Sequence, residues 1–159
     1  MTRWLSVQQQ QHWRAYIAAT TLLDERLSRE LQAAHGLTMA DYEILVRLSE
    51  APEQRLRMSQ LASCTLASRS RLSHQVDRLE KAGLVERQAC ESDRRGANAV
   101  LTELGRTSLV AAAPTHVEGV RRHFVDQLTD DQFTALGEAL ALVAAHLQDS
   151  EPGTEEPAV

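Results

Sequence analysis

Apolar residues recur at helical spacing along almost the whole chain, and one short stretch breaks that period. The first helix is expected over residues 8–34, where the recurring apolar side chains are Trp13, Ile17, Leu23, Leu27 and Leu31. Between residues 84 and 101 the pattern changes to two strand-like runs, 84–87 and 98–101, around a polar tip. With 7 glycines and 4 prolines, the chain lacks the turn residues of a β-rich fold. The predicted fold class is mainly α with a small two-stranded β hairpin, or wing.

Helices are also expected directly before this hairpin. Thr38 and Ser68 are N-cap residue types, and each precedes a run of apolar residues at helical spacing. The helix that begins at Thr38 ends before a polar loop over residues 51–57, and a short helical pattern follows over 59–63. The helix that begins at Ser68 is expected to reach residue 82, because Gly83 then suits a left-handed C-terminal cap.

The last third of the chain returns to helical spacing. One helix is expected over residues 103–126, with a kink at Pro114 because proline has no backbone N–H to donate. Another is expected from Thr129 to about residue 147, since Thr129 and Gln132 have the spacing of a capping box. The predicted chain is therefore helical on both sides of a single hairpin.

Charge is distributed unevenly along the 159 residues. The formal net charge is −5, but residues 53–96 hold nine Arg and Lys against six Asp and Glu, a local net charge of +3. A basic segment within an acidic protein can still present a focused positive face to nucleic acid. The acidic remainder disfavours indiscriminate coating of DNA.

The polar face of the helix over 68–82 indicates a function. When Leu72, Val76 and Leu79 point inward, arginine, serine, histidine and glutamine side chains point outward. Such groups donate to phosphates and to base edges, and arginine and glutamine suit guanine and adenine in turn. The hairpin tip adds two arginines that suit the minor groove. The candidate DNA-binding residues are Ser68, Arg69, Ser70, Arg71, Ser73, His74, Gln75, Arg78, Arg94 and Arg95.

At these residues the sequence resembles the MarR family of bacterial regulators. The resemblance covers residues 37–105, extends more loosely over 8–148, and is most specific in SRSRLSHQVDRLEKAGLVER and in DRRG followed by VLTELG. It implies a winged helix-turn-helix lobe over 37–102, with a recognition helix at 68–82. It also implies a homodimer and a palindromic double-stranded DNA operator, usually bound by a repressor that a small aromatic or phenolic ligand or oxidation relieves.

The resemblance also implies a division of the chain. Residues 8–36 and 103–148 would form the helical dimerisation region, and the acidic tail 149–159 is expected to be disordered. Trp13 and Tyr16 are expected in the dimer core, with a weaker expectation that they border an effector pocket. Two features depart from the family: Thr65 and Leu66 occupy the turn before the recognition helix, and the first helix has no cysteine. Peroxide sensing through such a cysteine is therefore not expected.

No metal site or cofactor is expected. The six histidines are scattered, and Cys64 and Cys90 lie far apart without metal-ligand spacing. His74 alone among the histidines lies on the predicted reading face, and the two cysteines are expected to be inert. Two cysteines without a disulfide pattern, no apolar run of signal-peptide type and none of about 18 residues indicate a cytoplasmic protein without a membrane span.

Two other classes of function remain to be weighed against DNA binding. An enzyme is not expected, because the chain has no nucleophile elbow, phosphate loop or zinc-protease motif. A winged-helix module that binds proteins and has no affinity for DNA is the alternative that the acidic net charge of −5 leaves open.

Overall fold

The computed structural model describes residues 2–65, 67–90 and 93–149, with only the backbone of residues 93–95 and 149. Two compact units divide the chain between Val120 and Arg121, within helix α5. The predicted functional division, into a lobe over 37–102 with flanking helices, is of another kind and stays a prediction. Most of the predicted disordered tail lies outside the described residues.

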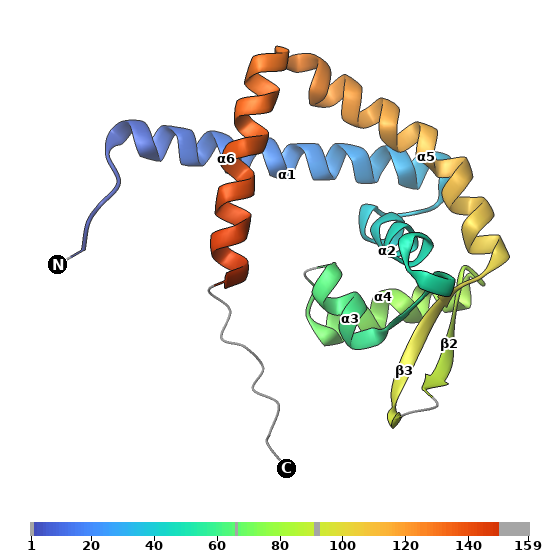
Figure 1. Ribbon diagram of the computed structural model, residues 1–159. Helices are drawn as coiled ribbons and strands as arrows, with labels where there is room; N and C mark the ends of the chain where they lie inside the picture. Colours follow the sequence, from blue (N-terminus) through green and yellow to red (C-terminus); the bar gives the residue numbers. More distant parts are fainter. Residues whose placement is uncertain (1, 66, 91–92, 150–159) are drawn as a thin grey trace. The chain divides into compact units, whose positions relative to one another are not determined.

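The helices and strands follow one another along the chain in the order of the colours in Figure 1. The first are α1 (Val7–His35), α2 (Met39–Glu50), the 3₁₀ turn η1 (Pro52–Gln54), β1 (Arg55–Arg57), α3 (Met58–Cys64), α4 (Arg69–Lys81) and β2 (Val85–Cys90). The elements that follow are β3 (Asp93–Leu101), α5 (Glu103–His123), the 3₁₀ turn η2 (Val125–Gln127) and α6 (Asp130–Asp149). The mainly α fold class is confirmed, and α5 continues through Pro114.

The sheet has one strand more than the sequence predicted. Its order is β1-β3-β2, and both pairs are antiparallel. The additional strand β1 lies in the segment 51–57, which was predicted to be a loop, and it pairs Leu56 with Ala99. A run of three residues is too short to show the alternation of a strand, so the sequence pattern could not predict it. The strand forms because β3 lies beside it.

Side chains cap the N-termini of α2 and α4, two helices that the sequence predicts. Thr38 and Asp41 form a reciprocal capping box at the start of α2, and the Ser68 hydroxyl accepts from the Arg71 backbone N–H at 3.3 Å. Gly36 and Gly83 follow α1 and α4 with φ of 69° and 75°, in the left-handed region that glycine adopts without strain. The predicted N-caps Thr38 and Ser68 and the predicted stop at Gly83 are confirmed.

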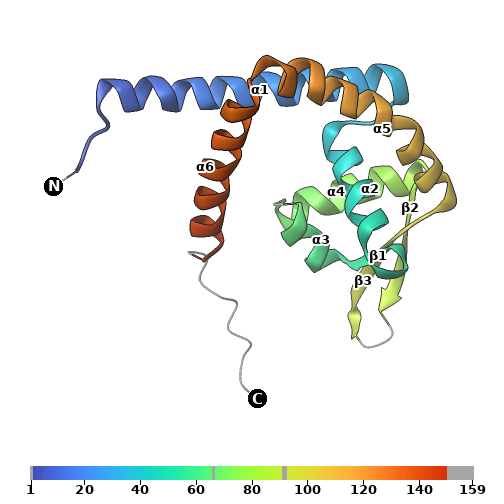
Figure 2. The same cartoon turned by 45° about the horizontal axis from the view of Figure 1, so that its top comes forward.

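One hydrophobic core joins α2, α3, α4, the sheet and α5. Leu72, Val76 and Leu79 of α4 are buried in it, as their spacing predicted. Each such side chain contributes about 1.5–3 kcal/mol when fully buried, which makes packing the main force that holds α4 in the lobe. Figure 2 shows α2, α3 and α4 gathered above the sheet, from which the hairpin projects.

Close backbone approach fixes the start of α5 against β2. Gly105 lies where a Cβ atom would come within 2.0 Å of the carbonyl oxygen of Leu84. Thr102 supports the same junction, since its hydroxyl donates to the carbonyl oxygen of Gly83 at 2.7 Å and its N–H to that of Leu84 at 3.1 Å. A side chain at position 105 would push these two elements apart.

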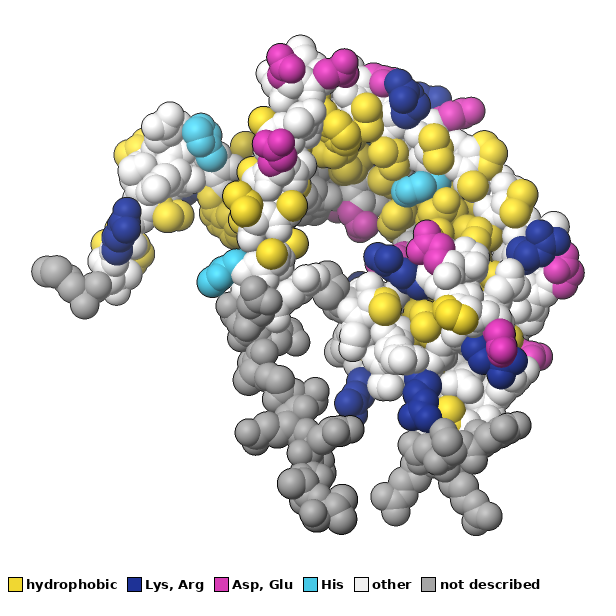
Figure 3. All heavy atoms as spheres, viewed as in Figure 1, with side chains coloured by type: hydrophobic (Ala, Val, Ile, Leu, Met, Phe, Trp, Pro, Cys, Tyr) yellow, Lys and Arg dark blue, Asp and Glu magenta, His cyan; other side chains and the backbone are white. Residues whose placement is uncertain are grey.

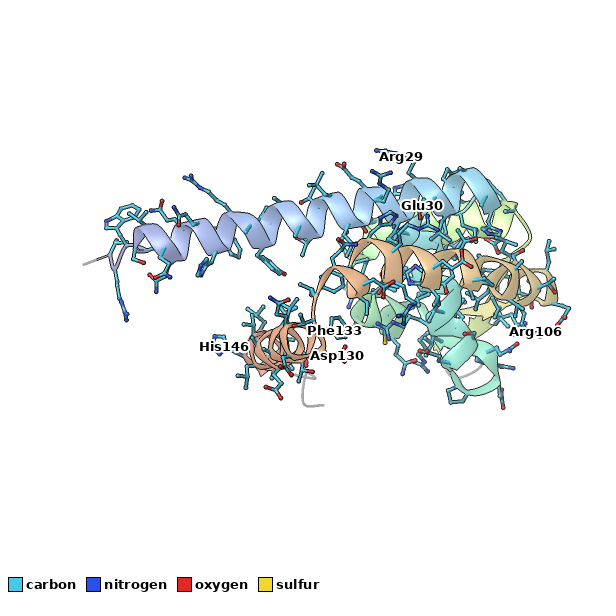
Figure 4. All side chains as sticks on the ribbon, turned by 90° about the horizontal axis from the view of Figure 1, so that it is seen from above. Arg29, Glu30, Arg106, Asp130, Phe133 and His146 are labelled. Atoms are coloured by element: carbon cyan, nitrogen blue, oxygen red, sulfur yellow. The ribbon has the colours of Figure 1, made fainter. Side chains whose placement is uncertain are left out.

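Many large apolar side chains among the described residues are exposed. Trp13, Tyr16, Ile17 and Leu22 of α1 are exposed. In the second unit, the same holds for Phe133, Leu140, Leu142, Val143 and Leu147 of α6. Figure 3 shows apolar side chains along the visible faces of these helices, and Figure 4 shows Phe133 and Asp130 in the first turns of α6.

Candidate nucleic-acid interface

Helix α4 presents a polar face to solvent opposite its buried residues. Ser68, Arg69, Ser70, Arg71 and His74 are all exposed, and they lie at the N-cap and in the first two turns. No ion pair joins Arg69 or Arg71 to another residue whose side chain the structure describes. Their guanidinium groups are therefore available to phosphate oxygens and base edges, as a recognition helix requires.

The remaining predicted residues of this helix are Ser73, Gln75 and Arg78. Ser73 and Gln75 are half-buried. Arg78 is exposed, as predicted, and its guanidinium also donates to the buried carboxylate of Asp41 and, at 3.2 Å, to the hydroxyl of Thr38. The buried Asp41 needs such a partner, because an unpaired buried charge is costly. A DNA contact by Arg78 stays a prediction.

The predicted wing is formed by β2 and β3. Their register runs from Val85 paired with Leu101 to Cys90 paired with Asp93, with an irregularity after Ala89. Arg94 and Arg95 lie at the beginning of β3, next to the tip of the hairpin. Their side chains lie outside what the structure describes, so their contact with the minor groove stays a prediction.

Arg87 of β2 is a residue of this region that the sequence did not single out. Its Nη1 lies 2.6 Å from Asp77 Oδ1 and 2.7 Å from Glu80 Oε2. Its Nη2 donates to the backbone carbonyl oxygen of Ser73 at 3.0 Å. One arginine of the wing thus holds three residues of α4. The spacing of Ser73, Asp77 and Glu80 along one helix face could have indicated a shared partner, but not which one.

A cavity of about 560 Å³ lies beside the polar face of α4. Its walls come from α1, α2, α4 and the segments before the latter two, and they include Asp24, Ser28, Glu43, Arg71, His74 and Arg78. Trp13 and Tyr16, the predicted effector residues, do not line it. Their rings stack on each other with centroids 5.7 Å apart. The cavity is of a size that takes a small organic ligand, and its walls are more polar than such sites usually are.

A second aromatic pair joins α5 to α2. The rings of His116 and Tyr42 have centroids 4.5 Å apart, and burial lowers the pKa of His116 and raises that of Tyr42. No described residue forms a hydrogen bond with the His116 Nδ1 atom. Nearby, His35 Nε2 lies 2.8 Å from the hydroxyl of Thr115, which ties the end of α1 to α5. Burial thus favours the neutral form of the His116 imidazole.

Two further observations concern the described part of the chain. It contains no group of three or more His, Cys, Asp or Glu side chains placed to hold a metal ion. None of its helices is both long enough and apolar enough to cross a membrane.

Comparison with known proteins gives a consistent result. The MarR family model matches residues 35–96, which contain α2 to β2 and the start of β3. The regulator PecS of Dickeya dadantii (strain 3937) is 29% identical over 133 residues, covering 82% of this chain and 79% of the relative.

Two solved structures from Streptomyces coelicolor are more similar. AbsC, a MarR family transcriptional regulator, is 51% identical with a TM-score of 0.87, over 94% of this chain and 100% of that one. Sco3205, a MarR family transcriptional regulator solved in complex with DNA, is 47% identical with a TM-score of 0.90, over 98% of each chain. The chain therefore belongs to the MarR family of transcriptional regulators, whose winged helix-turn-helix is formed here by α2, α3, α4 and the hairpin.

Proposed function

We propose that the chain acts as a homodimer that binds a pseudo-palindromic operator in double-stranded DNA and represses transcription until an effector binds. The observation that carries this proposal is the exposed face of α4, where Arg69, Ser70, Arg71 and His74 point to solvent. Two such helices enter successive major grooves, about one helical turn apart, and the arginines at the hairpin tip enter the flanking minor grooves. The complex of Sco3205 with DNA supports this assignment.

The dimer covers the apolar side chains that one protomer leaves in solvent. These lie on α1 and on α6, and the exposure of several such side chains on each helix would favour association with a second copy. Sedimentation at micromolar concentration is expected to give twice the 17.7 kDa of a single chain. A species of 17.7 kDa at all concentrations would remove the dimer, and with it the palindromic operator.

Effector response would use the cavity beside α4. Arg71 and His74 belong both to its walls and to the outward face of the recognition helix. A small aromatic or phenolic ligand with polar substituents would therefore contact the helix that contacts DNA. It can shift DNA affinity only as far as it prefers one arrangement of that helix over another. The proposed setting is the cytoplasm, and the proposed role is regulatory and not catalytic.

Fluorescence anisotropy on duplexes from the DNA around its own gene tests the proposal. Binding is expected to be saturable, to weaken steeply as salt is raised, and to be stronger on one duplex than on its scrambled control. A panel of phenolic acids is then added to the complex, and release by at least one compound is expected. Flat titrations at low salt on every duplex would favour a winged-helix module that binds proteins instead.

A further inference from the structure

We propose that Arg87 is a positioning residue for DNA recognition, which sets the rotation of α4 about its axis and joins that helix to the wing. The inference rests on the proposed DNA-binding function and adds a residue to it that need not touch DNA. It follows from the contacts between one guanidinium group of β2 and three successive turns of α4.

The contacts of Arg87 are many for one half-buried side chain. Its side chain is 23% exposed, and its Nη1 lies within 2.7 Å of carboxylate oxygens of both Asp77 and Glu80. Its Nη2 donates to the carbonyl oxygen of Ser73 at 3.0 Å. The backbone N–H of Arg87 also donates to Glu80 Oε1 at 3.0 Å, so Glu80 is held by both the backbone and the side chain of β2.

The three partners lie along one face of the helix. Ser73, Asp77 and Glu80 are spaced by four and three residues, which places them one above another on α4. Hydrogen bonds and ion pairs from Arg87 to these three residues resist rotation of the helix about its axis. The hydrophobic contacts of Leu72, Val76 and Leu79 hold the helix to the lobe, but apolar attraction is non-directional and tolerates a small rotation. Hydrogen bonds depend on direction, so they fix the angle more narrowly.

Small rotations matter for reading bases. A helix with its side chains is about 10–12 Å across, so a rotation of about 20° moves side-chain ends by about 2 Å. Hydrogen bonds to base edges form only when the donor–acceptor distance lies within a range of about 0.5 Å. The exposed residues Arg69, Ser70, Arg71 and His74 would then lose their register with the base pairs, whereas contact with phosphates tolerates such a shift better.

A second arginine restrains the helix from another element. Arg78 leaves α4 to bind Asp41 and Thr38 at the start of α2. The helix is therefore held by polar contacts to α2 and to β2, and only the second of these reaches the wing. Loss of Arg87 is expected to remove the polar contacts between the helix and the hairpin, while the shared hydrophobic core and the contact with Asp41 remain.

A test has to distinguish the effect of Arg87 on the position of α4 from its effect on the charge of that helix. Arg87 neutralises Asp77 and Glu80, so its removal also leaves two unpaired carboxylates on the recognition helix. These would repel phosphates on every DNA sequence alike. The variant Arg87→Met tests both effects together. The triple variant Arg87→Met, Asp77→Asn, Glu80→Gln removes the carboxylates as well, so its ratio of affinities for two DNA sequences tests position, since the remaining charge change acts on both sequences alike.

The experiment uses the full-length protein and a duplex enriched by the wild-type protein from a random-sequence pool, with a scrambled duplex of equal length. For Arg87→Met, affinity for the enriched duplex is expected to fall roughly tenfold or more, the cost of about one mismatched base pair, and affinity for the scrambled duplex by less. The triple variant is expected to regain affinity for the scrambled duplex but not the ratio between the two. Selection repeated with the triple variant is expected to return a more degenerate motif.

Arg106→Met is the matched control, since Arg106 is paired with Glu103 within the first turn of α5, at 2.5 Å, outside the lobe that reads DNA (Figure 4). It is expected to bind both duplexes as the wild type does. If Arg87→Met does not fold, as judged by circular dichroism, Arg87→Lys replaces it, because lysine can hold one carboxylate but cannot bond all three partners. An unchanged ratio in folded Arg87→Lys and in the triple variant overturns the inference. If the wild type enriches no duplex, the proposed function fails instead.

Discussion

Arg78 of the recognition helix donates two hydrogen bonds to the first turn of α2, one to the buried carboxylate of Asp41 and one to the hydroxyl of Thr38. Asp41 is 3% exposed, and the N–H and hydroxyl of Thr38 also donate to it, at 2.9 Å and 2.7 Å. The Asp41 carboxylate therefore both completes the capping box of α2 and binds Arg78 of α4. Position and stability of the recognition helix are coupled through this carboxylate.

Arg78→Ala tests that coupling. It leaves Asp41 with only the donors of Thr38, and the loss of one partner from a buried acceptor costs about 1–3 kcal/mol of unfolding free energy. Urea denaturation followed by circular dichroism measures the change. The control Arg106→Ala breaks an exposed pair within one helix turn, for which a much smaller change in unfolding free energy is expected. Equal effects of the two substitutions would contradict the role given to Asp41.

Gly105→Ala is expected to destabilise the protein by about 1–3 kcal/mol, because the added methyl group would lie 2.0 Å from the Leu84 carbonyl oxygen and force backbone apart. Gly137→Ala in α6 is the matched control. A Cβ there meets nothing within 4 Å, so the better helix propensity of alanine is expected to stabilise by up to about 1 kcal/mol. Urea midpoints of the two variants should move in opposite directions. A shift of both in the same direction would show that the close approach at Gly105 is relieved without cost.

The helices and their caps could be predicted because the signals are local. Ser68 as N-cap, Gly83 as stop and the buried spacing of Leu72, Val76 and Leu79 all depend on residues within one turn or two of each other. Strand β1 could not, since three residues form a strand only when β3 lies beside them. The contacts of Arg87 and Arg78 could not be predicted either, because they join separate elements. The partners of Arg87 lie on α4, and Asp41, the partner of Arg78, lies 37 residues away in the sequence.

His116 is expected to make stability depend on pH. Burial lowers its pKa in the folded state below the ordinary value near 6.5, so the unfolded chain binds more protons when the pH falls through that value. The contribution of the neutral His116 to the unfolding free energy is therefore fully present above about pH 6.5. It is lost as the pH drops towards the folded-state pKa. Denaturation of the wild type and of His116→Phe, measured from pH 8 to about pH 5.5, should show a smaller decline in the variant. Parallel curves would mean that His116 is not the group responsible.

The wing is expected to contribute to affinity without selecting sequence. Arg95→Ala should weaken binding to the enriched and scrambled duplexes by similar factors and reduce the slope of log affinity against log salt by about one unit. Anisotropy titrations at three salt concentrations measure both quantities. Arg106→Ala again serves as a control and should leave the slope unchanged. A loss confined to the enriched duplex would instead assign Arg95 to base reading.

Footprinting of the full-length protein on its enriched duplex tests the pairing of two recognition helices with one operator most directly. Methylation interference in the major groove should mark two patches about 10 base pairs apart, related by the symmetry of a palindrome, and hydroxyl-radical cleavage should be reduced in the minor groove on their outer sides. A single patch, or interference spread evenly over the duplex, would contradict a dimer that reads DNA with α4.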